Sequence, residues 1–203
     1  MQPTSRRIAT WAVHGCAGLV LAMMTISEPT PAAAAQSCWT GENGQFFRKI
    51  EYCVSSVLAP AGETSYGPNH LMWFEGGADK AWCEGVEGYG LGETIMIKVE
   101  GAVPFRRLMV SNGYGKSPET FAQNGRVRTV EITSDTGIKA TIEFPDKNEM
   151  LPVNIPGMAQ KWIQFKIVDV YPGERSPNTC LTMLQPDHEY EEELLLREQG
   201  LNK

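Results

Sequence analysis

Segments in which apolar and polar residues alternate restrict the central part of the chain to β-structure. In residues 138–144, Ile, Ala, Ile and Phe alternate with Lys, Thr and Glu. Successive side chains of a strand point to opposite faces of its sheet, so a period of two is typical of a half-buried strand. The polar turn 134–137 joins this segment to residues 128–133 as a hairpin. Related patterns predict further strands at residues 52–58, 94–99, 106–111, 162–170 and 179–185.

The number and shortness of these strands favour a β-sandwich or barrel. Turn-forming Gly, Pro and Asn residues separate the strands at regular intervals. The composition agrees with one folded domain, since the chain has 203 residues, of which 42% are hydrophobic and 21% charged. Residues 162–170 are almost continuously apolar and are expected to form a central strand.

Two short helices are expected outside the strands. Ser117 and Pro118 are typical of a helix start, and Asn124 with Gly125 is typical of its end. In the tail that starts at residue 187, acidic residues occupy the first turns and a basic residue lies near the end, as the helix dipole favours. A solvated, frayed tail is the alternative. A folded tail could dock its Leu194–Leu196 run on the sandwich or on a partner.

The first 35 residues have the pattern of a secretory signal peptide. Arg6 and Arg7 precede a mostly apolar run, and the alanines at 32–35 offer a cleavage site. A membrane anchor is the alternative, but His14 and two glycines interrupt the run and no stop-transfer charges follow it. We therefore expect a periplasmic or secreted protein with no membrane span after cleavage.

Cleavage changes the charge and the cysteine count. It removes two basic residues and one acidic residue, which leaves 168 residues with a net charge of −7. The four remaining cysteines, Cys38, Cys53, Cys83 and Cys180, predict two disulfides with three alternative connectivities. No Cys-x-x-Cys pair occurs and two histidines remain, so a zinc site is not expected. The acidic charge disfavours a nucleic-acid partner.

The sequence favours a binding protein over an enzyme. Residues 88–92 are rich in glycine, but a nucleotide-binding loop needs a helix after it, and here a strand follows. Glu84, Glu87 and Glu93 in the same region could form an acid–base pair, although a solvated acidic loop is the simpler interpretation. The chain also lacks a Gly-x-Ser-x-Gly nucleophile motif. We therefore expect no catalytic residues.

Aromatic and polar residues between the predicted strands are the candidates for ligand binding. Aromatic faces suit the C–H surfaces of sugars, and amide and guanidinium groups bond sugar hydroxyls. Loops at one end of a sandwich commonly carry such a site. Trp82 and Tyr171 could instead plug the sandwich end, whereas Tyr89 and Tyr114, beside glycines, are expected at the surface. The candidate set is Trp82, Tyr89, Asn112, Tyr114, Lys116, Arg126, Tyr171 and Arg175.

Several stretches give the chain a resemblance to a known family. They are residues 55–60 and 65–71, the glycine-rich run 81–93, residues 112–117 and 124–128, Asp-Val-Tyr-Pro-Gly at 169–173, and Asn-Thr-Cys at 178–180. Together they resemble discoidin-like (F5/8 type C, galactose-binding-like) domains, in particular the branch associated with translocation of NAD glycohydrolase toxins. The resemblance implies an eight-stranded, jelly-roll-like antiparallel sandwich without catalytic activity. Members of this superfamily often bind glycans or cell surfaces, but fold analogy does not fix the ligand.

The resemblance also implies the organisation and the disulfide pairing of the chain. It implies a Cys83–Cys180 disulfide, and with it a Cys38–Cys53 disulfide. The expected function is an exported, non-catalytic module that binds a carbohydrate or envelope glycan through loops at one end. The alternative is a periplasmic protein-interaction or scaffold domain without sugar binding. The expected parts are a signal peptide (1–35), an N-terminal extension (36–50), the discoidin-like domain (51–186) and a charged helical tail (187–203).

Many domains of this superfamily hold a structural calcium ion, but the matching positions here are poor in oxygen ligands. Lys80 stands in place of a hydroxyl ligand and Met183 in place of a carboxylate. We therefore expect no cofactor, and we expect the Lys80 ammonium to replace the ion and pair with Glu75. Glu75 and Asp79 are the residual ligands if a cation binds.

Overall fold

The computed structural model describes residues 36–201, so the predicted signal peptide lies outside the described residues. The strands are β1 (Ser37–Glu42), β2 (Lys49–Val54), β3 (Trp82–Cys83), β4 (Thr94–Glu100), β5 (Phe105–Asn112), β6 (Gly125–Ser134), β7 (Lys139–Glu143), β8 (Met150–Ala159), β9 (Trp162–Tyr171) and β10 (Thr179–Pro186). The helical segments are η1 (Pro68–Leu71), α1 (Trp73–Gly76), α2 (Pro118–Gln123) and α3 (His188–Glu198). The predicted all-β fold with a short C-terminal helix is confirmed.

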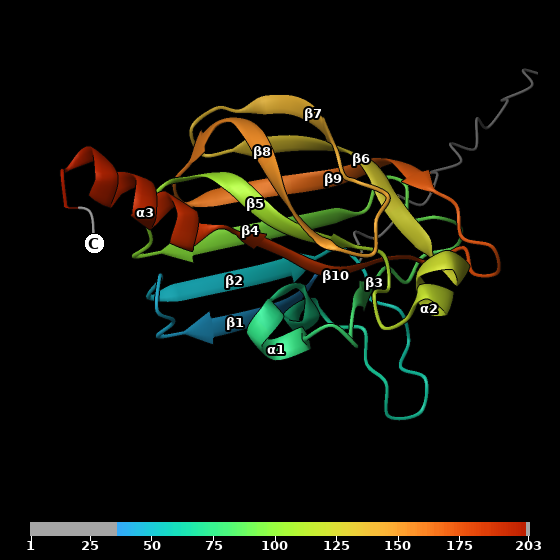
Figure 1. Cartoon of the computed structure of the whole chain (residues 1–203). Helices are drawn as coiled ribbons and strands as arrows, with labels where there is room; N and C mark the ends of the chain where they lie inside the picture. The colour runs from blue at the N-terminus through green and yellow to red at the C-terminus, as the bar shows by residue number, and fades with distance from the viewer. Residues whose placement is uncertain (1–35, 202–203) are drawn as a thin grey trace, which may run out of the picture. The chain divides into compact units, whose positions relative to one another are not determined.

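The strands form one curled sheet in the order β1-β2-β4-β9-β6-β10-β5-β8, with β7 paired to β6 and β3 paired to β10. Neighbouring strands are antiparallel, except that β6 and β10 meet through two parallel pairs, Gly125 with Thr179 and Arg126 with Cys180. At this short junction the sheet folds over, and β5, β8 and β10 pass across β4, β9 and β6 (Figure 1). The result is a jelly-roll-like sandwich of two layers.

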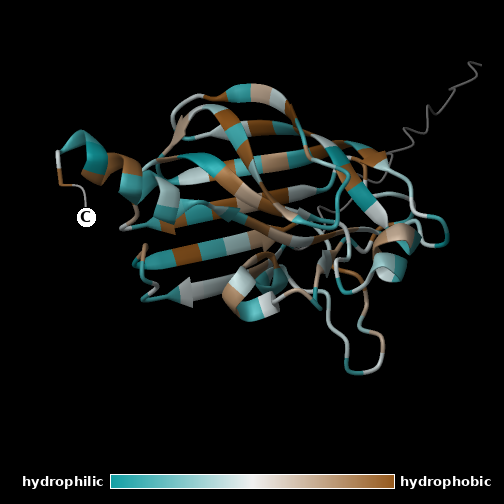
Figure 2. Cartoon of the chain, in the orientation of Figure 1, coloured by the Kyte–Doolittle hydropathy of each residue, from teal (hydrophilic) through white to brown (hydrophobic). Residues whose placement is uncertain are grey.

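The alternation in the sequence becomes the core between the layers. On β4, Ile95, Ile97 and Val99 are buried, and the residues between them are at least partly exposed. From β5 of the other layer, Leu108 and Val110 join the same cluster. Hydrophobic and hydrophilic residues accordingly alternate along the strands in Figure 2. Each fully buried side chain of this size contributes roughly 1.5–3 kcal/mol through the hydrophobic effect.

Both implied disulfides are present. Cys38 lies opposite Cys53 across β1 and β2, and the two are bonded. Cys83 lies opposite Cys180 across β3 and β10, and this disulfide closes a sequence separation of 97 residues. The second disulfide therefore fixes the segment around β3 to the last strand.

Both expected helices form. α2 begins with a capping box, in which Ser117 and Thr120 each accept the other's backbone N–H. At α3, Asp187 caps the N-terminus and forms an ion pair with Arg107 at 2.7 Å. The buried Glu191 carboxylate accepts a backbone N–H of β5 at 2.7 Å, so the tail is docked on the sandwich rather than frayed. Within residues 36–201 no helix is long and apolar enough to cross a membrane.

The N-terminal part of the sandwich differs from the expectation. The sequence predicts an extension over residues 36–50, but β1 and the start of β2 lie there, and β2 pairs with β4 along its whole length. The predicted strand 52–58 also ends earlier, at Val54. Just beyond it, the Ser55 hydroxyl donates to the Glu93 carboxylate at 2.7 Å and accepts from Thr94 N at 2.8 Å, so a side chain replaces the backbone carbonyl as acceptor at the end of the ladder.

The sequence does not predict β8. Its residues include Pro152 and Pro156, and proline cannot donate a hydrogen bond to a neighbouring strand. β8 is the last strand of the sheet order and pairs with β5 alone, so its outer edge needs no donors. Proline is tolerated at such an edge, and it also protects the edge from pairing with other chains.

Candidate functional site

The two ends of the sandwich carry different loops (Figure 1). The loop end, where α2 lies, consists of residues 84–93, 113–124 and 172–178, which are joined by hydrogen bonds such as Glu174 N to Ala122 O at 3.0 Å. The α3 end consists of residues 43–48, 101–104, 160–161 and α3. The predicted binding residues belong to the loop end.

Two aromatic members of the predicted set are buried there. Trp82 is fully buried and its Nε1 donates to Ser56 O at 3.0 Å, which agrees with the plug interpretation. Tyr114, expected at the surface, is only 8% exposed and packs edge-on against Tyr66. Burial raises the pKa of Tyr114. The surface expectation for Tyr114 is wrong because its turn packs into a cluster around the Cys83–Cys180 disulfide.

The amide of Asn112 is fully engaged inside the protein. Its Nδ2 donates to Val127 O at 2.6 Å and to Pro145 O at 3.0 Å. Its Oδ1 accepts from Gly113 N and Val127 N, both at 3.0 Å. Because Asn112 is buried and makes all four bonds, its amide joins β5 to β6 and has no capacity for a ligand.

Arg126 has a similar internal role. Its Nε donates to the Asp146 carboxylate at 2.6 Å, and its side chain is only 11% exposed. Its Nη1 donates to the backbone oxygens of Phe121, Asn124 and Pro172 at 3.3, 2.9 and 3.4 Å. Arg126 therefore holds α2 and the β9–β10 connection against β6.

The other four predicted residues retain some exposure but do not form one surface. Lys116 and Arg175 are exposed, and Tyr89 is half-buried. Lys116 precedes α2, whereas the backbone N–H of Arg175 bonds the last residue of α2 at 3.2 Å. The Tyr171 hydroxyl donates to the Glu143 carboxylate at 2.9 Å. The structure thus brings Tyr171 near Arg126, while Lys116 and Arg175 lie at opposite ends of a helix.

The glutamates of the glycine-rich loop are bonded separately. Glu84 is fully buried, and its carboxylate accepts two backbone N–H groups at 2.9 and 3.0 Å. Burial raises the pKa of Glu84. Glu93 accepts from Ser55, and Glu87 is exposed. These bonds support the beginnings of β4 and β10, and the nearby Glu93 charge adds to the rise in the pKa of Glu84.

The region matched to the calcium site lacks the expected ion pair. Lys80 and Glu75 are both exposed, and among the ion pairs of residues 36–201 none joins them. The expectation that Lys80 pairs with Glu75 is wrong, because two solvated side chains gain little from holding one geometry. Asp79 is exposed and Met183 is buried. The described part of the chain contains no cluster of three His, Cys, Asp or Glu side chains that could hold a metal ion.

A hollow at the α3 end gathers polar side chains around an indole. This Trp162 hollow has a volume of about 540 Å³, within the usual range of ligand pockets. Trp162 is half-buried, and Gln160 and Lys161 are exposed in the turn before it. The hollow is not predicted from the sequence, because Trp162 fits the pattern of a central strand and is not recognised as a loop residue. The lining residues are Arg48, Lys98, Val99, Glu100, Gly101, Ala102, Pro104, Gln160, Lys161 and Trp162.

Backbone bonds fix the three loops that form the Trp162 hollow. Val99 N donates to Lys161 O, and Arg48 N donates to Glu100 O, both at 2.8 Å. Gly101 has a φ of +69°, and a Cβ there would lie 2.9 Å from the Arg48 Cβ. Glycine at this position therefore permits the tight turn between β4 and β5.

Asp135 positions the turn that precedes Trp162. Its Oδ1 accepts from Gln160 N at 3.1 Å and from Trp162 N at 3.4 Å. Partial burial alone would raise the pKa of Asp135, but backbone N–H groups of residues 160–162 lower it below its usual value. An ionised carboxylate thus holds one wall of the hollow in place.

Basic groups outnumber acidic groups around the Trp162 hollow. Arg48 is paired with Glu100 at 2.8 Å, and Lys98 with Glu51 at 2.6 Å. Lys161 has no ion-pair partner among residues 36–201. In a chain of net charge −6, a hollow lined by three basic residues and one acidic residue is a distinct feature. An indole face with donors and acceptors around it can hold an apolar surface and bond its hydroxyl or anionic groups.

Comparisons with known proteins found one family model and several solved structures that are similar to this chain. The family model described as NAD glycohydrolase translocation F5/8 type C domain matches residues 44–185. No curated protein matches the chain. Among solved structures, the family 32 carbohydrate-binding module of Clostridium perfringens NanJ, in complex with galactose, is 12% identical, with a TM-score of 0.46 over 68% of this chain and 92% of that chain. A second C. perfringens family 32 module, in complex with GalNAc-β-1,3-galactose, is 14% identical, with a TM-score of 0.48 over 68% and 94%.

Proposed function

The chain belongs to the NAD glycohydrolase translocation F5/8 type C domain family, and we propose that it is an exported, non-catalytic module that binds a carbohydrate. The Trp162 hollow carries this proposal. Sugars are recognised by stacking their C–H faces on an aromatic ring and by bonding their hydroxyls to planar polar groups. Trp162, Gln160 and Arg48 supply both kinds of contact within one hollow of about 540 Å³.

The charges of the hollow support an acidic sugar as the ligand. Lys161 is free of ion pairs in the described residues, and Arg48 and Lys98 are exposed beside it. A carboxylate or sulfate on the sugar would add charge-assisted bonds, which are about twice as strong as neutral hydrogen bonds. A neutral sugar would gain the stacking contact and neutral hydrogen bonds to its hydroxyls, but no charge-assisted bond.

Two further observations support the remaining parts of the proposal. Disulfides persist in oxidising compartments, so Cys38–Cys53 and Cys83–Cys180 support export. The internal hydrogen bonds that occupy the Glu84 and Glu93 carboxylates support a module that binds without catalysis. Catalysis by two carboxylates requires both to face one reacting bond.

A glycan array followed by calorimetric titration of the full chain tests the proposal. The probes are oligogalacturonate and a neutral galactose oligomer of equal length. We expect the acidic oligomer to bind more tightly, Trp162→Ala to lower affinity more than about tenfold, and Lys161→Gln to weaken the acidic oligomer alone. Lys139→Gln, an exposed lysine on β7, is the matched control and should change nothing.

The predicted loop-end residues give the experiment a second outcome. If Tyr89→Ala or Arg175→Gln abolishes binding while Trp162→Ala retains it, the carbohydrate site is at the loop end. If no glycan binds at all, the carbohydrate function is rejected, and the scaffold alternative takes its place.

A further inference from the structure

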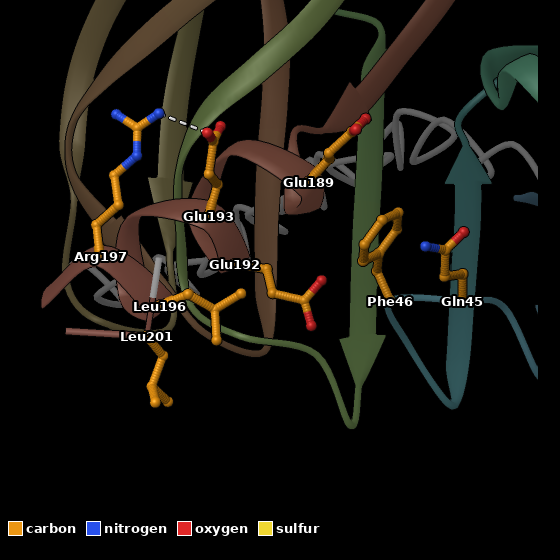
Figure 3. Close-up of a pocket in the computed structure, with 8 residues that line it drawn as sticks. All are labelled: Gln45, Phe46, Glu189, Glu192, Glu193, Leu196, Arg197 and Leu201. Atoms are coloured by element: carbon orange, nitrogen blue, oxygen red, sulfur yellow. Dashed lines mark hydrogen bonds and ion pairs between the residues drawn. The ribbon is translucent and has the colours of Figure 1, made fainter. Parts of the chain in front are cut away.

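A second surface, separate from the Trp162 hollow, lies between α1 and α3. Two hollows of about 450 and 740 Å³ share Phe46, Glu189 and Glu193 and so form one groove, the α3 groove. Its apolar lining residues include Phe46, Met72, Phe74, Met109, Met150, Pro152, Leu196 and Leu201. Figure 3 shows part of the groove, with Glu192 between Leu196 and Phe46.

The apolar part of the α3 groove is unusually open to solvent. Phe74 on α1 is 83% exposed and Met150 is 42% exposed. Exposed apolar patches with a polar rim commonly mark interaction sites. Three methionines line the groove, and methionine side chains adapt to the shapes of different partner side chains.

The exchangeable donors and acceptors of Gln185, Arg107 and Asp187 on the groove floor are already bonded within the protein. Gln185 Oε1 accepts from Trp73 N at 3.1 Å. Arg107 donates to Asp187 at 2.7 Å, and its guanidinium carbon lies 3.3 Å from the centre of the Tyr190 ring. Sugar hydroxyls would find few free partners here, so the floor favours apolar side chains.

The rim of the α3 groove is acidic. Glu189 and Glu192 are exposed and have no ion-pair partner among residues 36–201, whereas Glu193 pairs with Arg197. A second copy of this chain would bring like charges together, and an anionic lipid surface would be repelled. A ligand with basic groups beside apolar groups fits both the rim and the floor.

We propose that the α3 groove binds an amphipathic helical segment of a polypeptide, with apolar side chains on one face and Lys or Arg on the other. The apolar side chains contact Phe74 and Met150, and the basic side chains pair with Glu189 and Glu192. This function is additional to carbohydrate binding, since none of the residues that line the groove lines the Trp162 hollow.

Fluorescence anisotropy of labelled peptides with the full chain tests the groove. The probe is a peptide of about 18 residues, five helical turns, with leucines at i, i+3 and i+4 spacing and lysines elsewhere. The matched probe replaces every lysine by glutamate. We expect the lysine peptide to bind with an affinity that falls as salt rises, and the glutamate peptide to bind at least about tenfold more weakly.

Variants of the chain place the peptide on the α3 groove. Phe74→Ser should lower affinity about tenfold, and Glu189→Gln with Glu192→Gln should lower it about three- to fivefold and reduce its salt dependence. Leu91→Ser, at the 64% exposed leucine of the loop end, and Glu87→Gln are the controls and should leave binding unchanged. Equal binding of the two peptides, no binding of either, or equal losses with Leu91→Ser and Phe74→Ser would overturn the proposal.

Discussion

The two ends of the sandwich use the same residue types for different purposes. At the loop end, Asn112 and Arg126 use their donors on backbone carbonyls and on a carboxylate. At the α3 end, Arg48 is 73% exposed and Lys161 has no ion-pair partner in the described residues. Polar and aromatic loop residues are therefore candidates for a ligand only where the fold leaves their bonding capacity unused.

The junction between β6 and β10 explains the difference. There the sheet passes from one layer to the other through two residue pairs, so backbone groups beyond the junction need other partners. Asn112, Arg126 and Glu84 provide those partners. At the α3 end, turns such as the one at Gly101 are closed by backbone bonds, so these turns do not need side chains such as Lys161 as partners.

The largest expected effects are the losses of stability on removing each disulfide, and the two losses should differ. Replacing Cys83 and Cys180 by alanine should lower the free energy of unfolding by about 4–5 kcal/mol, and replacing Cys38 and Cys53 by about 3 kcal/mol. The reason is loop length, since the sequence separations are 97 and 15 residues. Urea denaturation followed by circular dichroism measures both. Equal losses would mean that the long connection does not determine the stability of the loop end.

The second prediction concerns the two tryptophans. Trp82→Ala should cost about 4 kcal/mol because it empties a fully buried site and leaves Ser56 O without its donor. Trp162→Ala, at a half-buried residue, should cost about 1–2 kcal/mol and yet remove carbohydrate binding. Denaturant titration and calorimetry of both variants give the comparison. If Trp82→Ala is the milder change in stability, the assignment of roles to the two ends fails.

Local patterns in the sequence predict the strands and helices of this fold well. Residues 94–99 fall in β4, and β7 covers residues 139–143 of the predicted strand 138–144, because period-two burial is a property of a single strand. The Ser117 cap and the tail helix also depend on neighbouring residues alone. β8 escapes prediction because its prolines are compatible with a strand only at the edge of the sheet, and edge position is a property of the whole topology.

The site is harder to predict because exposure and residue type are different properties. Tyr114 and Tyr89 both stand beside glycines, yet Tyr114 is buried by Tyr66 and the disulfide cluster. The Trp162 hollow arises where three loops distant in sequence meet, joined by Val99 N to Lys161 O and Arg48 N to Glu100 O. The residue pattern of a single loop does not predict that these three loops lie side by side.

The third prediction tests the α3 end through pH. His188 is buried between Phe47 and Phe105, and burial lowers its pKa from 6.5 to about 4. Between pH 6.5 and about 4, His188 is therefore mostly protonated in the unfolded chain and mostly neutral in the folded chain. Stability should be full above pH 6.5 and should fall by up to about 3 kcal/mol as the pH drops to about 4.

The variant His188→Leu is the control for this prediction, because other groups also titrate in the same range. His70 has a lowered pKa for the same main reason, burial, and contributes with the same sign. The difference between the wild-type and His188→Leu unfolding curves, measured from pH 7 to 4, isolates the α3 end. If the free energy of unfolding falls by the same amount with pH in both proteins, then His188 is accessible to protons in the folded chain, and α3 opens readily.

The smallest expected effect compares one arginine at each end. Arg126→Gln should cost about 2 kcal/mol, because an 11% exposed guanidinium bonds Asp146 and three carbonyls that would lose their donors. Arg48→Gln should cost less than about 0.5 kcal/mol, since its pair with Glu100 is solvated. The denaturant midpoints of the two variants give these losses in the free energy of unfolding, provided that the dependence on denaturant concentration is the same for both. A large loss with Arg48→Gln would mean that the Arg48–Glu100 pair stabilises the fold as strongly as the bonds of Arg126. Arg48 would then not be available to bond a ligand.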